Sequence, residues 1–181
     1  MTGSVTLRPV EEGDLEPIAR FSVEPEALGE FQFAGFTDPR SWRRRWEENG
    51  LLADDASTLA VVTPDGIFAG IVGWRPVVSM SGGGVVRRSP SSVEIGIALL
   101  PELRGRGYGT GAQSALVRYL FAHTPVHRIQ AVTTAGNLAE ETALTNAGFR
   151  REGVLREVGL WAGRWTDAVM YAVVRGDEPS T

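Results

Sequence analysis

Hydrophobic positions along this chain repeat with two different periods, and the period predicts which segments are strands and which are helices. Alternating or continuous apolar residues, many of them β-branched, predict strands at residues 5–8, 58–63, 67–74, 93–100, 128–133, 149–160 and 165–175. Capping signals, or apolar residues three and four apart, predict helices at residues 12–21, 38–49, 112–123 and 137–147. Strands and helices in this order indicate a mixed α/β sheet.

Turn and cap residues mark where several of these segments begin and end. Pro64-Asp65-Gly66 is a turn signal, so the second and third predicted strands are expected to form a hairpin. Asp38 is the expected N-cap of the second helix, with Pro39 at its first position. Gly148 is the expected stop of the last helix. Residues 76–92 are rich in Ser and Gly, and we interpret them as a mobile loop.

A glycine-rich turn lies between the fourth predicted strand and the third predicted helix. The strand ends at Pro101, and the turn then reads Arg-Gly-Arg-Gly-Tyr-Gly-Thr-Gly over residues 104–111. Glycines allow several backbone N–H groups to be exposed at a helix N-terminus, where the helix dipole favours an anion. Arg104 and Arg106 add positive charge. The turn therefore predicts a phosphate cradle. The helix after it carries one apolar stripe, formed by Ala112, Ala115, Leu116, Tyr119 and Leu120.

Two common phosphate motifs fit this turn poorly. A Walker-type loop ends in Gly-Lys-Ser/Thr, and this turn has no lysine. The spacing Gly107-x-Gly109-x-x-Ala112 matches a dinucleotide fingerprint. However, the following strand runs into Thr133 and Thr134, with no acidic residue at its end to hold a ribose. An oxidoreductase that uses NAD is therefore the weaker interpretation.

The turn also resembles the phosphate motif of the GNAT superfamily of acyl-CoA-dependent N-acyltransferases. That motif, Gln/Arg-x-x-Gly-x-Gly/Ala, is matched by residues 104–109. Further segments are similar to the branch that acetylates N-terminal amines of ribosomal proteins (RimJ/RimL-like). They are residues 7–10, 14–15, 94–96, 137, 147–150, 153–157, 163–167 and 170–171. The resemblance covers nearly the whole chain. It implies a single domain with a GNAT-like, mostly antiparallel α/β (α+β) sheet flanked by helices.

The resemblance also implies which residues bind the acyl-CoA co-substrate. The backbone of the strand before the turn pairs with the pantetheine arm, and the amides of the turn hold the pyrophosphate. Asn137 hydrogen-bonds the pantetheine or an ordered water, and it is also a good N-cap with capping-box spacing to Glu140. The expected binding residues are Ile97, Ala98, Leu99, Arg104, Gly105, Arg106, Gly107, Tyr108, Gly109, Thr110 and Asn137.

Glu94 is the candidate catalytic base. Strand alternation places it on the same face as Gly96 and Ala98 and opposite Ile95, beside the expected thioester. A partly desolvated carboxylate there could accept the amine proton, directly or through water. The alternative, which stays open, is a strand carboxylate that only pairs with an arginine.

Two positions depart from the pattern of the resembling branch. Glu140 stands where that branch often has Ser, and Leu144 stands where many members have the Tyr that protonates the leaving thiolate. The general acid is therefore unassigned. Tyr171 and Tyr108 are candidate substitutes, with packing as the alternative role for each. These departures keep a second function open, namely a GNAT-fold protein that binds acyl-CoA without transferring the acyl group.

Aromatic residues near the N-terminus raise two further questions. In the resembling family this region folds over the acceptor site, so Phe31, Phe33 and Phe36 either line that site or fill the core. Trp42 and Trp46 are four residues apart and share a helix face. We interpret this helix as a solvated face with a buried tryptophan pair, in preference to a site for an acidic partner.

Composition narrows the class of protein. The 181 residues suit one domain, numbered 1–181, with an expected flexible tail at 176–181. A net charge of −4 argues against nucleic-acid or anionic-membrane partners. With no cysteine, and with two isolated histidines, no metal site is expected. The absence of a signal peptide or spanning segment favours the cytoplasm. The expected partners are acetyl-CoA or another acyl-CoA and an amine-bearing acceptor, either a small molecule or a protein N-terminus. A homodimer is compatible with the resemblance.

Overall fold

A computed structural model of the chain describes residues 3–32, 35–80, 86–161 and 163–177, with only the backbone described at 78–80 and 86–90. Its strands are β1 Thr6–Pro9, β2 Ser57–Val62, β3 Phe68–Met80, β4 Val86–Leu99, β5 Arg128–Thr134, β6 Arg150–Trp161 and β7 Arg164–Val174. Its α-helices are α1 Leu15–Val23, α2 Pro25–Leu28, α3 Arg40–Asn49, α4 Tyr108–His123 and α5 Leu138–Asn146. Short 3-10 turns, η1 Glu12–Asp14 and η2 Pro101–Leu103, precede α1 and α4.

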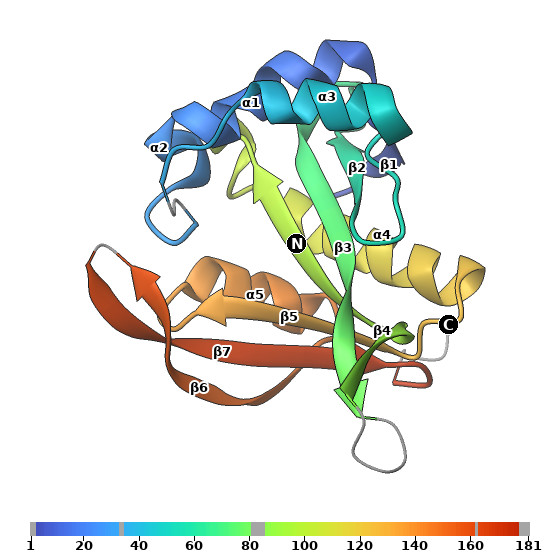
Figure 1. Ribbon diagram of the computed structural model, residues 1–181, viewed down its shortest axis with the longest axis vertical. Coiled ribbons are helices and arrows are strands. Elements are labelled where there is room, and N and C mark those ends of the chain that lie inside the picture. The colour runs from blue at the N-terminus through green and yellow to red at the C-terminus, as the bar shows by residue number, and fades with distance from the viewer. Residues whose placement is uncertain (1–2, 33–34, 81–85, 162, 178–181) are drawn as a thin grey trace.

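The seven strands form one mixed sheet in the order β1-β2-β3-β4-β5-β7-β6. The β4–β5 pair is parallel, and the other neighbours are antiparallel. Figure 1 shows α1, α2 and α3 gathered over the β1–β4 part of the sheet, while α5 lies beside β5 and β7. The mixed, mostly antiparallel architecture expected from the sequence is confirmed.

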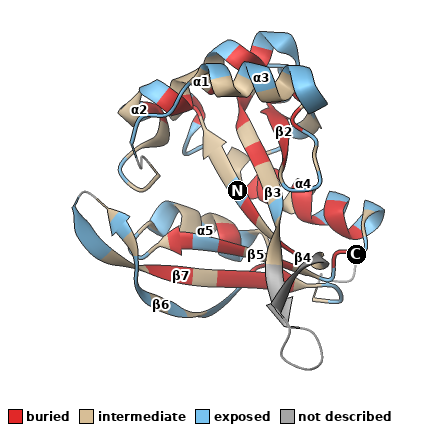
Figure 2. Cartoon of the chain, viewed as in Figure 1, coloured by how far each residue is buried: buried red, intermediate tan, exposed pale blue. Residues whose placement is uncertain are grey.

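The main core lies between α4 and the centre of the sheet. Leu116 and Leu120 of α4 are fully buried and pack with Val93 and Ile95 of β4 and with Ile129 of β5. Figure 2 shows buried positions along β2, β3 and α4. Ala112, Leu116 and Leu120 of the stripe predicted for α4 are buried, whereas Tyr119 is 41% exposed and the buried face turns instead toward Val117 and Phe121.

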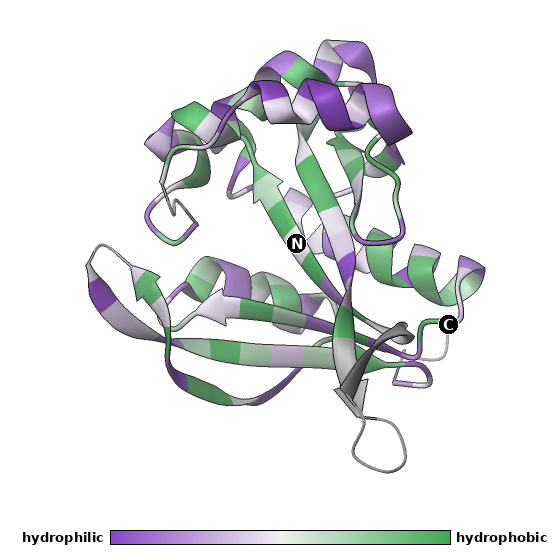
Figure 3. Cartoon of the chain, in the orientation of Figure 1, coloured by the Kyte–Doolittle hydropathy of each residue, from purple (hydrophilic) through white to green (hydrophobic). Residues whose placement is uncertain are grey.

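Helix α3 is attached to the rest of the fold by its two tryptophans. The indole of Trp46 donates to the Val10 carbonyl at 2.8 Å, and that of Trp42 donates to the Ser22 hydroxyl at 3.1 Å. Both rings pack on a second core cluster that contains Ile18. Figure 3 shows that the rest of the α3 surface is largely hydrophilic, which agrees with a solvated helix carrying a tryptophan pair.

The predicted loop at residues 76–92 is wrong, because β3 and β4 continue through most of it. The ladder shifts register after Pro76 and then pairs Val77 with Ser89 through to Met80 with Val86. Backbone pairing requires an extended chain but no apolar side chains, and Pro76 sits at the bulge, where a missing N–H is tolerated. Residues 81–85 of the predicted loop lie outside the described residues.

The remaining differences concern the ends of helices. The first predicted helix divides into η1 and α1, and the short helix α2 was not predicted. Pro39 is the N-cap of α3, where Asp38 was expected. The Asp38 carboxylate still accepts from the Arg40 backbone N–H at 3.0 Å, so it satisfies one helix donor from one position further out. Among the described residues, none of the helices has the length and apolarity needed to cross a bilayer.

Candidate active site

The site forms where β4 and β5 part. The two strands are paired only at Ser92–Arg128, Val93–Ile129 and Glu94–Gln130. Beyond Glu94, β4 stays paired with β3 as far as Leu99. Figure 1 shows β4 and β5 diverging from this short join, with α5 on the β5 side. One edge of β4 is therefore without a strand partner in the described part of the chain.

A cavity of about 960 Å³ adjoins that edge, and we call it the loop cavity. Its walls come from the residue 28–32 segment, the end of β4, the glycine-rich turn and the first turns of α5. Of the residues predicted to bind the co-substrate, eight line it: Ile97, Leu99, Arg104, Gly105, Gly107, Gly109, Thr110 and Asn137. Arg106 and Tyr108 do not line it, and Ala98 lines a second cavity.

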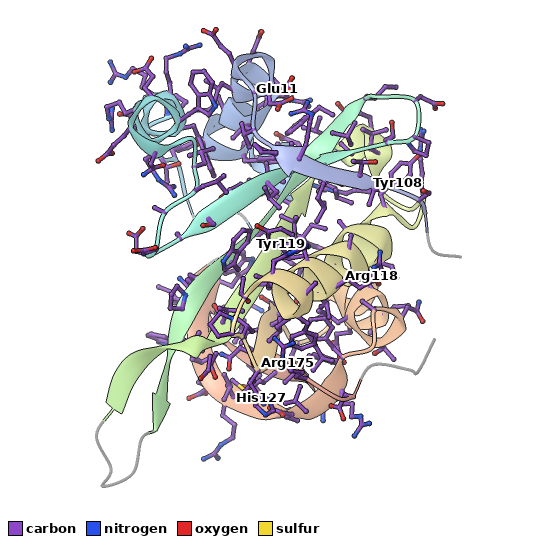
Figure 4. The ribbon with its side chains drawn as sticks, turned by 90° about the vertical axis from the view of Figure 1, so that its right-hand side faces the viewer. Glu11, Tyr108, Arg118, Tyr119, His127 and Arg175 are labelled. Carbon is purple, nitrogen blue, oxygen red and sulfur yellow. The ribbon has the colours of Figure 1, made fainter. Side chains whose placement is uncertain are left out.

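The glycine-rich turn has the backbone geometry of an anion site. Gly105 and Gly107 have φ of +73° and +80°, values that favour glycine. Gly107 is the N-cap of α4, and no side chain caps this helix end. The N–H groups of the first helical turn have no partner one turn earlier, so they are available to a phosphate. Tyr108, labelled in Figure 4, is partly buried against the main core and does not line the loop cavity.

Arg104 has a more structural position than the sequence suggested. Its Nε donates to the Leu99 carbonyl at 3.0 Å, and its Nη2 donates to the Ala27 carbonyl of α2. Burial lowers the pKa of this guanidinium, and Glu102 offsets part of that effect. Arg104 thus ties α2 to the end of β4, while its side chain still forms part of the cavity wall.

The free edge of β4 is bonded by a side chain at one further point. Gln32 donates its Nε2 to the Ile97 carbonyl at 2.8 Å. Since the Ile97 and Leu99 carbonyls both accept from side chains at the loop cavity, they point away from β3. An extended ligand pairing with this edge would take the place of Gln32.

A second cavity of about 480 Å³ lies against the β4 face that carries Glu94, Gly96 and Ala98, and we call it the Glu94 cavity. The Glu94 carboxylate accepts from Arg75 Nη2 at 2.5 Å and from Gln130 Nε2 at 3.2 Å. The arginine pairing that the sequence left open is therefore present. The two cavities share three lining residues: Leu28, Gln32 and Ile97.

Glu140 lies in the wall of the loop cavity, on the first turn of α5. Its carboxylate accepts from Gln113 Nε2 at 2.5 Å, so it does not complete a capping box with Asn137. Asn137 does cap the helix, since its Oδ1 accepts from the Glu140 backbone N–H at 3.4 Å. Burial raises the pKa of Glu140 from 4.5 to about 7, and the Gln113 hydrogen bond offsets part of that rise.

Comparison with known proteins shows the family. Residues 4–150 match the family described as Acetyltransferase (GNAT) domain. This chain belongs to the GNAT acetyltransferases. An uncharacterized N-acetyltransferase p20 of Bacillus licheniformis is 24% identical over 176 residues, which cover 96% of this chain and 94% of that protein.

Two further comparisons show the range of proteins that this acetyltransferase is similar to. The [ribosomal protein uS5]-alanine N-acetyltransferase of Escherichia coli is 30% identical over 51% of this chain and 48% of its own length. The spermidine N-acetyltransferase of Vibrio cholerae, crystallised with CoA and spermine, has the same fold with a TM-score of 0.79. It is 19% identical, and the match covers 96% of this chain and 97% of that one.

Of the other residues considered for this acetyltransferase, Leu144, Tyr171 and Phe36 line neither cavity. Leu144 is fully buried in the core, and the Tyr171 hydroxyl donates to Glu141 at 3.0 Å. Phe36 is 73% exposed, and Phe33 lies outside the described residues. Phe31 lines the loop cavity and is absent from the wall of the Glu94 cavity.

Two glutamines were missed by the sequence analysis. Gln113 is 1% exposed and interrupts the buried face of α4, so a polar residue within an apolar stripe was the available signal. Gln32 lies in a segment without periodicity, and its role depends on a contact with Ile97 that no local pattern encodes. Among the described residues, no group of three His, Cys, Asp or Glu side chains could hold a metal ion.

Proposed function

We propose that this acetyltransferase moves an acyl group, with acetyl as the default, directly from acyl-CoA to a primary amine. The observation that carries the proposal is the pair of cavities at β4, one at its free edge and one against the face of Glu94, which share Ile97 in their walls. An acyl donor in the loop cavity and an amine in the Glu94 cavity would approach each other at this point. We further propose that residues 1–181 act as one domain, in the cytoplasm, without nucleic-acid or membrane partners.

The walls of the loop cavity fit a coenzyme A thioester. The uncapped start of α4 offers amides for the pyrophosphate, and the free edge of β4 offers the Ile97 and Leu99 carbonyls for the amides of the pantetheine arm. Asn137 contributes an amide group at the start of α5. When bound, the thioester supplies an activated acyl group. The chain holds and orients that group.

Glu94 is the proposed acceptor of the amine proton. An ammonium cannot attack a carbonyl carbon, so the acceptor must lose a proton before or during the transfer. Glu94 is the one carboxylate among the described residues that line its cavity. Arg75 and Gln130 fix its position, and a proton could reach it directly or through water.

The charges of the Glu94 cavity favour some amines over others. Its described wall holds two arginines, Arg45 and Arg75, against Glu94, which Arg75 already pairs. A polyamine carries several positive charges, and the wall would repel those beyond the reacting amine. The proposed acceptor is therefore an amine on a neutral or acidic body, such as a peptide N-terminus.

An acceptor panel tests that preference. We expect a peptide with an acidic side chain near its N-terminus to give a kcat/KM at least about tenfold above that of spermidine, because about 1.4 kcal/mol of electrostatic preference suffices for this ratio. Arg45→Gln should reduce the ratio of kcat/KM for the acidic peptide to that for spermidine. Equal or better use of spermidine by the unaltered protein would contradict the charge argument.

The function itself is tested by ligand binding followed by thiol release. Acetyl-CoA should raise the free energy of unfolding by about 2.7 kcal/mol at a hundredfold excess over its Kd, whereas NAD should not. Gly109→Leu should abolish that response, because a side chain there points toward Leu99 in the cavity wall. Release of free thiol with an amine present would then establish transfer.

The same experiment separates the second candidate function. Stabilisation by acyl-CoA with no thiol release for any amine would indicate a GNAT-fold binding protein. The burial of Leu144 and the position of Tyr171, neither of which offers a hydroxyl to the cavity, favour that alternative unless another residue supplies the proton.

A further inference from the structure

Transfer from a thioester needs a proton at a second place, the sulfur of the leaving group. A thiolate is expelled as the acyl carbon–sulfur bond breaks, and an acid beside the sulfur lowers the barrier. Five described residues of the loop cavity wall could carry an acidic or hydroxyl proton or a cationic charge: Glu30, Arg104, Thr110, Thr142 and Glu140. Arg104 is bonded to two carbonyls, and Glu30 and Thr142 are exposed. Thr110 belongs to the first turn of α4, which is proposed to hold the pyrophosphate.

We propose that Glu140 is the acid that protonates the sulfur of the departing coenzyme A, and that Gln113 is the positioning residue that holds its carboxyl group at the cavity. This inference rests on the proposed function. It assigns a catalytic residue on α5 where neither Leu144 nor Tyr171 can serve.

The placement of Glu140 carries the argument. It lies on the first turn of α5, near Asn137, and lines the cavity whose wall also includes Ile97 and Leu99 of β4. Gln113, almost fully buried on α4, reaches the carboxylate at 2.5 Å. The oxygen of this amide, Gln113 Oε1, is buried and has no hydrogen-bond partner among the described residues. A buried amide with one unmet group is costly, so its presence indicates a purpose beyond packing.

The chemical state of Glu140 suits an acid. With a pKa raised to about 7 by burial, the group holds a proton for much of the time near neutral pH. Filling the cavity with the pantetheine arm removes further water and favours the protonated form again. A thiol has a pKa of about 8.5, so a carboxyl group near 7 gives up its proton to a thiolate readily. No cation forms an ion pair with Glu140 among the described residues, and the Gln113 hydrogen bond, which favours the carboxylate, offsets only part of the effect of burial.

The transfer forms a carbon–nitrogen bond and breaks the acyl carbon–sulfur bond. An ammonium acceptor first loses one proton to Glu94, which later releases it to solvent. The amine nitrogen then bonds to the acyl carbon and loses its second proton to water as the amide forms. The carbon–sulfur bond breaks and its electron pair moves to sulfur. The Glu140 carboxyl proton moves to sulfur and gives the free thiol, which leaves Glu140 as a carboxylate. Glu140 then takes a proton from solvent before the next turnover, and no oxidant, reductant or further reactant is required.

The first test is the pH dependence of kcat for the unaltered protein, Glu140→Gln and Glu141→Gln. The control residue is the next one on α5, and its carboxylate contacts Tyr171 outside the cavity. We expect Glu140→Gln to lower kcat about 100-fold at pH 6.5. The unaltered protein and the control should lose kcat as pH rises past about 7, and Glu140→Gln should not. A Glu140→Gln enzyme within twofold of the unaltered one, with the same loss at high pH, would overturn the proposal.

The second test does not depend on turnover. Calorimetric titration of acetyl-CoA at pH 7.5, in two buffers that differ in ionisation enthalpy, reports protons taken up on binding. Net uptake should be greater for the unaltered protein than for Glu140→Gln, while both bind with Kd values within about threefold. Equal uptake would contradict the assignment of Glu140. Failure of both proteins to bind acetyl-CoA would instead overturn the proposed function.

Gln113→Leu tests the positioning role. Leucine is of similar size and removes the unmet Gln113 Oε1. The Glu140 carboxyl group loses its Gln113 donor but can stay neutral by keeping its proton, so the fold should persist. Because the Gln113 hydrogen bond lowers the pKa of Glu140, its loss should move the fall in kcat to higher pH, with kcat itself reduced. An unchanged pH profile would limit Gln113 to a structural role.

Discussion

At the scale of single residues, two glycines that face each other across β3 and β4 differ in what they tolerate. Gly73 and Gly96 are register partners, and both line the Glu94 cavity. A Cβ on Gly96 would meet no heavy atom within 4 Å, whereas a Cβ on Gly73 would lie 2.7 Å from the Ser57 carbonyl oxygen. A side chain at residue 96 would therefore extend into the Glu94 cavity. Residue 73 must be glycine because the backbone of β2 lies too close for a Cβ.

A substitution at each glycine separates acceptor binding from folding. Gly96→Leu should raise the acceptor KM at least about tenfold, leave the Kd for acetyl-CoA unchanged, and change stability by no more than about 0.5 kcal/mol. Gly73→Ala should destabilise the protein by about 1–3 kcal/mol through overpacking. Steady-state kinetics and urea unfolding measure the two effects. Normal acceptor kinetics in Gly96→Leu would mean that the amine enters elsewhere.

Glu140 also makes a prediction about stability and pH. Its pKa in the folded protein, about 7, lies above the ordinary value of 4.5, so the folded state loses stability as pH rises from about 4.5 to 7. At pH 8, Glu140→Gln should therefore unfold at a higher temperature than the unaltered protein, and its free energy of unfolding should be greater by up to about 3 kcal/mol. At pH 4 the two proteins should unfold at the same temperature.

Glu152 is the control for this effect, with the opposite sign. Arg128 donates to its carboxylate and lowers its pKa, so its contribution is present above the ordinary pKa and is lost in acid. Glu152→Gln should reduce stability at pH 8 and leave it nearly unchanged at pH 3. Thermal unfolding across pH checks both variants. If the stability of both variants, relative to the unaltered protein, changed in the same direction with pH, a raised pKa for Glu140 would be contradicted.

At the scale of elements, α3 depends on few contacts. It has no fully buried residue, and the Trp46 indole supplies one of its hydrogen bonds to the rest of the fold. Trp46→Phe keeps most of the ring but leaves the Val10 carbonyl without this donor, so we expect a loss of about 1–2 kcal/mol in unfolding free energy. Glu48→Gln, on the exposed face of the same helix, should change it by less than about 0.5 kcal/mol. Chemical denaturation measures both.

The elements also show where sequence patterns succeed. The turn at 104–111 was predicted because glycine at positive φ and a helix N-terminus are local properties, written in consecutive residues. The long extensions of β3 and β4 were missed because their ladder is a relation between two segments, and Ser-rich residues pair as well as apolar ones when both backbones are extended.

The same distinction applies to the candidate site. Strand alternation gave the face of Glu94 correctly, since period two is a backbone property. Pairing with an arginine could be named only as an alternative, without saying which arginine, because the choice of Arg75 requires the register between β3 and β4. The raised pKa of Glu140 could not be predicted from the sequence, because it depends on burial and on a contact with Gln113, which lies 27 residues earlier in the chain.

At the scale of the molecule, the two parts of the sheet are joined by a short strand pairing between β4 and β5. Three residue pairs join the β1–β4 part to the β5–β7 part, and the loop cavity has walls from both. A ligand that contacts both walls should reduce opening at this join. In native-state hydrogen exchange, acetyl-CoA should slow the amides of residues 128–130 more than those of β2, because local opening is suppressed where the ligand bridges. Equal slowing throughout would contradict a bridging position.

The shared wall at Ile97 has a consequence for inhibition. A compound that joins coenzyme A through its sulfur to an acceptor amine could occupy both cavities at once, with a short linker crossing at Leu28, Gln32 and Ile97. The tether would present the second half at a high effective concentration, and linked ligands of this kind can gain about 10²–10⁴ in affinity over either half. Selectivity among related enzymes would then come from the half that meets Arg45 and Arg75, since the other half addresses a backbone cradle built largely from glycine.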